Sequence, residues 1–107
     1  MKSLLGAVLV AAFSPGVGAV LAQNVTAPDQ TQACRVCHAL DGLGTNSMIP
    51  NIGGQSTEYL SKQLQDFRAG RREDPQMSII ARDLTDEDIK ALADWYGSVL
   101  ATYELPQ

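Results

Sequence analysis

The residues with the clearest chemical potential are Cys34, Cys37 and His38, in the motif Cys34-Arg35-Val36-Cys37-His38. They are the chain's only two cysteines and its only histidine. On a helix, Cys34 and Cys37 are i and i+3, so both thiols face one edge and the imidazole of His38 lies beside them. This order is typical of covalent attachment of a c-type haem, in which two sulfurs bind the haem vinyl groups and the histidine is one axial ligand of iron.

Two other kinds of site use the same spacing. A thioredoxin-like disulfide between Cys34 and Cys37 is expected in a βαβ context, and the sequence pattern shows none. A structural zinc site normally takes four cysteine or histidine ligands, whereas this chain offers only three. The motif therefore favours one covalently bound haem c.

The first 22 residues have the pattern of a secretory signal peptide. Lys2 precedes an apolar run over 4–13, and the segment ends in Val20-Leu21-Ala22, which suits signal peptidase. The alternative is an uncleaved membrane anchor, but Ser, Pro and Gly interrupt residues 14–18. We expect a signal peptide over 1–22 and an exported, periplasmic domain over 23–107, with membrane association only if the segment is kept as an anchor.

Charge and size narrow the class of protein. The chain has 12 acidic and 8 basic residues and a formal net charge of −4, so nucleic acid is not an expected partner. A mildly acidic surface suits redox partners that carry a basic docking patch. A domain this small has only a marginal apolar core of its own. An enclosed haem would supply the missing apolar core, so the chain should fold stably only when it retains haem.

Hydrophobic periodicity predicts an all-α domain of about four short helices around the cofactor. A first helix is expected over residues 28–39, with Thr26 or Asp29 as its N-cap. A glycine-rich loop follows over 41–55, long enough to wrap one side of a flat ring. A second helix is expected to start near Ser56 and to end at Gly70.

The last helix has the strongest local pattern. Thr85 is the expected N-cap, Asp88 completes a capping box, and Leu84 can contact Ile89 as a hydrophobic staple. Its predicted apolar face consists of Ile89, Leu92, Ala93, Tyr96, Val99 and Leu100.

The second axial ligand is expected to be a methionine. With one histidine in the chain, a second imidazole ligand is excluded. After signal removal Met48 and Met77 remain, and Met48 in the glycine-rich loop could equally fill a gap in the core. Met77 is favoured because it follows Pro75 in a segment expected to be flexible and to lie between helices, with enough chain to return across the other face of the ring.

Several further residues occur in an order that resembles the class I, mitochondrial-type cytochromes c, and within them one haem domain of the bacterial cytochrome c4 type. They are Cys34-x-x-Cys37-His38, Pro50, Gly53-Gly54-Gln55, Tyr59-Leu60, Gln63-Leu64, Phe67-x-x-Gly70-x-Arg72, Met77 and the run from Leu84 to Ile89. The resemblance covers roughly residues 32–100 and implies the class I cytochrome c fold.

The resemblance also implies roles for site residues. His38 and Met77 would be the axial pair, and the Pro50 carbonyl would accept a hydrogen bond from the ring nitrogen of His38 that faces away from iron. Arg72 would help to neutralise a haem propionate. Pro50 could instead only stiffen the loop, and Arg71 and Arg72 could be a solvated pair.

The chain departs from the family pattern in three places. It has one attachment motif where cytochromes c4 have two domains in tandem. Ala39 stands where glycine is frequent, which should be harmless. The first helix shows Gln30, Thr31 and Ala33 where a bulky apolar residue usually packs on the last helix, so this contact is expected to be thin unless Val25 or Val36 substitutes.

Iron with both axial positions filled has no site for substrate, so the expected function is periplasmic one-electron transport without catalytic residues. The expected partners are an electron donor and an acceptor, for example a flavoprotein or a terminal oxidase. One alternative is a haem c subunit of an oxidoreductase, resembling the cytochrome subunit of flavocytochrome c sulfide dehydrogenases. Another is a gas sensor with a weakly held sixth ligand.

Overall fold

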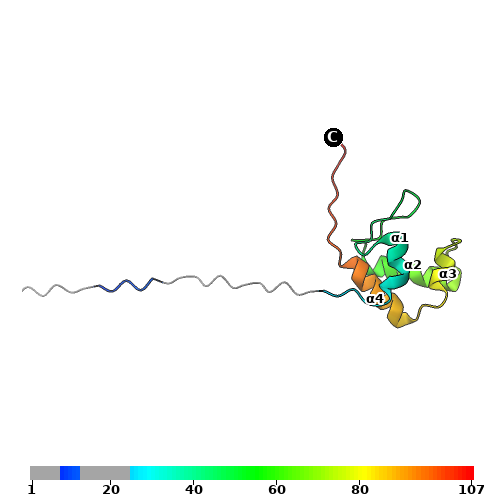
Figure 1. The fold of residues 1–107 in the computed structure, drawn as a ribbon, viewed down its shortest axis with the longest axis horizontal. Coiled ribbons are helices and arrows are strands. Elements are labelled where there is room, and N and C mark those ends of the chain that lie inside the picture. The colour runs from blue at the N-terminus through cyan, green and yellow to red at the C-terminus, as the bar shows by residue number, and fades with distance from the viewer. Residues whose placement is uncertain (1–7, 13–24) are drawn as a thin grey trace, which may run out of the picture.

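The computed structural model describes residues 8–12 and 25–107 of the chain (Figure 1). Within them the chain forms four helices and no strand: α1 (Thr31–His38), α2 (Thr57–Ala69), α3 (Met77–Ala81) and α4 (Asp86–Gly97). The predicted all-α architecture of about four short helices is therefore confirmed. No helix in this part of the chain is long and apolar enough to cross a membrane. Apart from residues 8–12, the predicted signal peptide lies outside the described residues.

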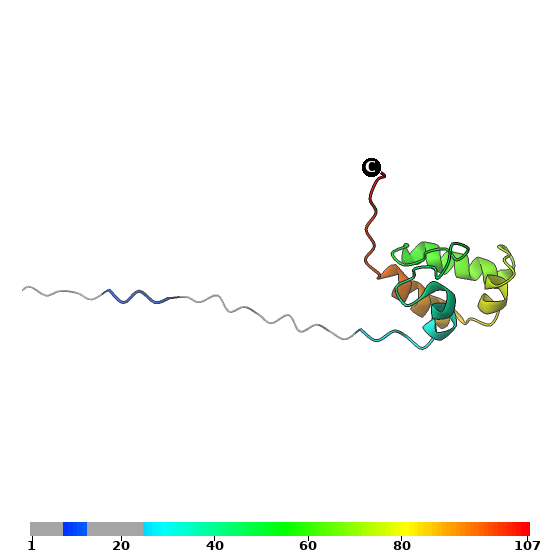
Figure 2. The same cartoon turned by 45° about the horizontal axis from the view of Figure 1, so that its top comes forward.

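The core lies where α2 and α4 pack side by side (Figure 2). Its buried side chains are Leu60 from α2 and Leu92, Ala93 and Tyr96 from α4. The two helices approach closely at Gly97, where a Cβ atom would lie 2.6 Å from the Thr57 hydroxyl oxygen. The shorter α3 packs against α2. This small core leaves the remaining apolar side chains of α2 available to line a cavity.

Local capping explains the ends of α2 and the start of α4. The Ser56 hydroxyl accepts a hydrogen bond from Tyr59 N at 3.2 Å, and Gly70 ends α2 in the left-handed conformation with a φ of 76°. Thr85 and Asp88 form the predicted capping box at the start of α4. These predicted helix boundaries are confirmed.

The predicted apolar face of the last helix is too long. The helix ends at Gly97, so Val99 and Leu100 lie beyond it, and Leu100 is 98% exposed. The reason is a contact from another segment: Gly54 N donates to Tyr96 O at 2.9 Å, so the glycine-rich loop meets the chain where α4 ends. Periodicity along the sequence could not show this termination.

The first helix begins later than predicted, and a polar contact joins its start to the last helix. It starts at Thr31, and neither Thr26 nor Asp29 caps it through a side chain. Val25 and Val36 are 75% and 74% exposed, so neither replaces the missing apolar contact. Instead, Gln30 Nε2 donates to Asp88 Oδ1 at 3.2 Å, which joins the starts of α1 and α4. The expectation of a thin apolar contact is thus consistent with the structure.

Candidate cofactor site

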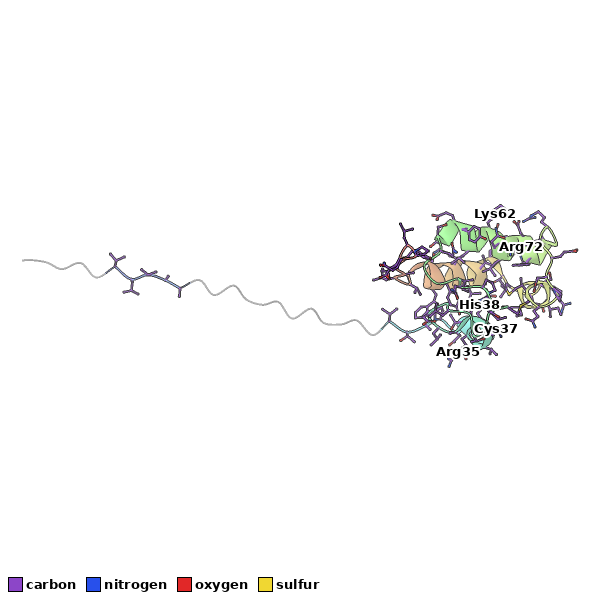
Figure 3. All side chains as sticks on the ribbon, turned by 90° about the horizontal axis from the view of Figure 1, so that it is seen from above. Arg35, Cys37, His38, Lys62 and Arg72 are labelled. Atoms are coloured by element: carbon purple, nitrogen blue, oxygen red, sulfur yellow. The ribbon has the colours of Figure 1, made fainter. Side chains whose placement is uncertain are left out.

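A cavity of about 300 Å³ lies among α1, the glycine-rich loop, α2 and α3. Its size is at the lower end of the range typical of cofactor sites. Its walls include the six residues that the sequence analysis assigned to the cofactor: Cys34, Cys37, His38, Pro50, Arg72 and Met77. Much of the remaining wall is apolar, with Leu60, Leu64, Phe67 and Ile80. Figure 3 shows Cys37 and His38 on the α1 side of the domain and Lys62 and Arg72 on the α2 side.

The attachment motif is helical, as its spacing predicts. Cys34 and Cys37 are half-buried free thiols, and both line the cavity one helical turn apart. Burial raises the pKa of the Cys34 thiol to about 11, so this sulfur is protonated at neutral pH before any attachment. Two thiols on one edge of a helix, facing an apolar cavity, fit the attachment of a flat apolar ring.

His38 is the last residue of α1, and its ring is oriented by a backbone carbonyl. It is 6% exposed, and its Nδ1 donates to the Pro50 carbonyl oxygen at 2.9 Å. A carbonyl can only accept, so Nδ1 carries a proton, and in the neutral ring the lone pair is then on Nε2. Neutral imidazole in this tautomer is the form that binds a metal. The predicted hydrogen bond between His38 and Pro50 is present.

The loop over residues 41–55 brings Pro50 back to His38 by a close approach of backbone to backbone. Gly42 has a φ of 79°, and a Cβ atom there would lie 2.1 Å from Gly53 N, so this position requires glycine. Ile52 N donates to Gly42 O at 2.7 Å, and Gly44 N donates to Asn51 Oδ1 at 2.8 Å. The cluster of glycines and asparagines is therefore what folds the loop over the cavity.

Two aromatic side chains of α4 hold the start of this loop. Trp95 Nε1 donates to Leu40 O at 2.8 Å, and the Tyr96 hydroxyl donates to Ala39 O at 2.9 Å. Burial raises the pKa of Tyr96 to about 12, with a smaller contribution from the negative charge of Cys34 in its thiolate form, so the hydroxyl keeps its proton as a donor at neutral pH. These bonds connect the α1 end that carries His38 to the buried face of α4.

The two candidate methionines differ in burial. Both line the cavity, but Met48 is 86% exposed at its rim, whereas Met77 is half-buried. Met77 is the first residue of α3, so the expectation that it lies between helices is wrong. A thioether that faces solvent must lose water contacts and rotamer freedom before it can bind a metal. The difference in burial therefore favours Met77.

Arg72 is held at the cavity by several groups of α2. Its guanidinium lies 4.5 Å from the centroid of the Phe67 ring, and Nη1 donates to Gln63 Oε1. Its backbone N donates to Asp66 O at 3.1 Å. A cation held in this way at an apolar cavity is suited to a carboxylate such as a haem propionate.

Two cavity residues were missed by the sequence analysis. Gln63 appeared in the resemblance but received no role, and the structure shows it holding Arg72. Asp74 Oδ2 accepts from the backbone N of Met77 at 2.8 Å and of Gln76 at 2.9 Å, which lowers the pKa of Asp74. The Asp74-Pro75 pair is a recognisable helix start, because aspartate favours the N-cap and proline the next position.

Comparison with known proteins agrees with this geometry. The family model for cytochrome c matches residues 29–99. The chain is 37% identical over 87 residues to a thiosulfate dehydrogenase electron acceptor from Stutzerimonas stutzeri (strain A1501), a match that covers 78% of this chain and 40% of that protein. It is 37% identical over 67 residues to the cytochrome subunit of sulfide dehydrogenase from Chlorobaculum tepidum, covering 63% of this chain and 60% of that protein.

A solved structure shows the same fold. The crystal structure of reduced recombinant cytochrome c4 from Pseudomonas stutzeri matches with a TM-score of 0.57 and 37% sequence identity, covering 63% of this chain and 38% of that chain. In each of these three matches the chain spans less than two thirds of the relative's length.

A helical domain with a C-x-x-C-H helix beside an apolar cavity has the architecture of the class I c-type cytochromes. The chain belongs to the cytochrome c family and is similar to one domain of cytochrome c4. Membership implies a covalently bound haem c, and Cys34 and Cys37 fit its attachment motif. The cavity also suits haem c chemically. It combines apolar walls with the imidazole of His38, the thioether of Met77 and the guanidinium of Arg72.

Proposed function

We propose that this chain is a periplasmic one-electron carrier whose haem is attached through Cys34 and Cys37 and ligated by His38 and Met77. The bound haem supplies a reversible one-electron change of its iron between the ferric and ferrous states. The observation that carries the proposal is the convergence of both thiols, the oriented imidazole and the half-buried thioether on one cavity.

The protein residues have separate tasks in this function. The Pro50 carbonyl holds the His38 ring and makes its other nitrogen a better ligand. Met77 offers a soft thioether, which favours ferrous iron, and the apolar wall formed by Leu64 and Phe67 disfavours the additional charge of the ferric state. Both effects raise the reduction potential, so the carrier should have a moderately positive potential.

Partner proteins follow from the same chemistry. With both axial positions filled, the chain has no substrate position on iron and acts by exchanging electrons with other redox proteins. An alternative is that it serves as the haem c subunit of an oxidoreductase, supported by its similarity to the cytochrome subunit of sulfide dehydrogenase. Co-purification of a flavin-containing chain would favour that alternative over a free carrier.

The axial ligand is tested by replacing each methionine in the haem-loaded protein. Met77→Ala should abolish the weak far-red absorption of methionine-ligated ferric haem and lower the potential by on the order of 0.2 V, within the ~0.8 V range that axial ligands set. Met48→Ala is the matched control and should leave both unchanged. Loss of the far-red absorption in Met48→Ala alone would contradict the assignment.

The gas-sensor alternative is tested with carbon monoxide. The ferrous wild-type protein should resist carbon monoxide at neutral pH, whereas Met77→Ala should bind it rapidly because its sixth position is open. Rapid binding by the wild-type protein would instead indicate a labile sixth ligand and favour a gas-binding role.

A further inference from the structure

The segment that leads into α3 is organised by the side chain of Asp74. Its Oδ2 accepts from Gln76 N at 2.9 Å and from Met77 N at 2.8 Å. Asp74 N donates to the Ser78 hydroxyl at 3.0 Å, and the Asp74 backbone oxygen accepts from Ser78 N at 3.1 Å. Asp74, Gln76 and Met77 all line the cofactor cavity.

This arrangement matters because α3 is too short to stabilise its own first turn. It has five residues, and helices of that length are unstable by themselves because the first turn costs more backbone entropy than its few hydrogen bonds offset. The first N–H groups of any helix also lack partners within the helix. Asp74 accepts from the N–H of Met77, the first residue of α3, and from the N–H of Gln76 just before it. Pro75, between Asp74 and Gln76, presets the backbone for a helical turn.

We propose that Asp74 is a positioning residue for the Met77 thioether. Its carboxylate holds the backbone of Gln76 and Met77 and so keeps the Met77 side chain at the cavity wall, ready to bind iron. The inference rests on the proposed role of Met77 as the second axial ligand. It assigns to Asp74 a structural hydrogen-bonding function rather than an effect of its negative charge.

Hydrogen bonding and charge predict different results for two substitutions. Asparagine caps helices about as well as aspartate, so Asp74→Asn keeps an accepting oxygen but removes the charge. Asp74→Ala removes both. If the hydrogen bonds position Met77, Asp74→Asn should keep Met77 bound to iron as in wild type. If the charge acts on the iron instead, the two variants should shift the reduction potential equally.

The experiment is ligand exchange in haem-loaded ferric protein. Imidazole is added in excess, and loss of the far-red absorption is followed by stopped flow. Losing the accepting carboxylate should make the conformation in which Met77 has left the iron about five- to tenfold more populated. Imidazole should therefore replace Met77 faster in Asp74→Ala by about that factor. Asp74→Asn should stay within about twofold of wild type, and its potential should stay close to that of wild type.

Two further variants complete the design. Glu73→Ala is the matched control, because Glu73 is exposed and takes part in no hydrogen bond or ion pair found among the described residues. It should exchange at the wild-type rate. Ser78→Ala removes the bond from Asp74 N and should accelerate exchange by a smaller factor, which keeps the inference testable if Asp74→Ala does not retain haem.

The outcomes separate the two proposals. If Met77→Ala keeps the far-red absorption and exchanges imidazole at the wild-type rate, Met77 is not the ligand and the ligation proposed above fails. If exchange depends on Met77 but Asp74→Ala and Ser78→Ala both match wild type, only the inference about Asp74 is overturned. Equal shifts of potential in Asp74→Asn and Asp74→Ala would also overturn it.

Discussion

At the scale of single residues, Ala39 shows the largest departure from expectation. It has φ 55° and ψ −179°, at the edge of a region that is essentially restricted to glycine. Both backbone polar groups of Ala39 form hydrogen bonds: its N donates to Arg35 O at 3.0 Å, and its O accepts from the Tyr96 hydroxyl. The sequence suggests that alanine is harmless here, whereas such a conformation typically costs roughly 1–3 kcal/mol.

We therefore predict that Ala39→Gly stabilises the haem-loaded protein by about 1 kcal/mol, the relief of strain exceeding the ~0.5–1 kcal/mol entropic cost of glycine. Equilibrium unfolding in guanidinium measures the change. Ala91→Gly within α4 is the control, and it should destabilise by about 1 kcal/mol because its backbone is helical. If both glycine variants lower the unfolding free energy, Ala39 is not strained.

At the scale of elements, Asp66 holds the end of α2 to the segment that carries Arg72. Its side chain is 11% exposed, accepts from Arg71 Nε at 2.8 Å and pairs with Lys62. Its backbone oxygen accepts from Arg71 N at 2.9 Å and Arg72 N at 3.1 Å. The hydrogen bond from Lys62, followed by that from Arg71, holds the pKa of Asp66 below its usual value.

This lowered pKa predicts an acid dependence of stability. Because the folded pKa lies below the unfolded value of about 3.9, the contribution is complete above that value and is lost as the pH falls through the folded pKa. Asp66→Asn should be less stable than wild type at pH 7, and the difference should shrink at acid pH. Unfolding free energies at both pH values measure this. Glu58→Gln, an exposed control on the same helix, should keep the wild-type acid dependence.

At the scale of the whole molecule, the cavity replaces much of the core. The buried cluster consists of a few side chains of α2 and α4, while α1, α3 and the glycine-rich loop border the cavity. Only the folded chain can enclose the haem, so its burial and ligation there should stabilise the native state strongly. The two cysteines thus support the fold as well as the function.

The corresponding prediction is that haem-free protein is largely unfolded. A Cys34→Ala, Cys37→Ala double variant, which cannot attach haem, should show little helical circular dichroism and no cooperative thermal transition. The haem-loaded wild type, purified from the same host, should melt cooperatively. A sharp transition in the haem-free variant would show that the α2–α4 core suffices.

The features that sequence alone predicted are those set by short-range chemistry. The spacing of Cys34, Cys37 and His38 defines their placement on one helix, and the caps at Ser56, Gly70 and Thr85 use hydrogen bonds within a few residues. Such interactions depend on local geometry, so residue types and spacing are enough to predict them. The fold class followed from the same local patterns.

Other features depended on segments far apart in the chain. The Ala39 carbonyl is held by the Tyr96 hydroxyl of α4, and α4 ends where Gly54 reaches it. The cavity gathers Pro50, Arg72 and Met77 with the attachment helix. Sequence alone therefore identified the candidate groups for the cofactor and the helix that carries Cys34, Cys37 and His38, whereas tertiary structure decided how closely these groups approach, because long-range contacts set distance and burial.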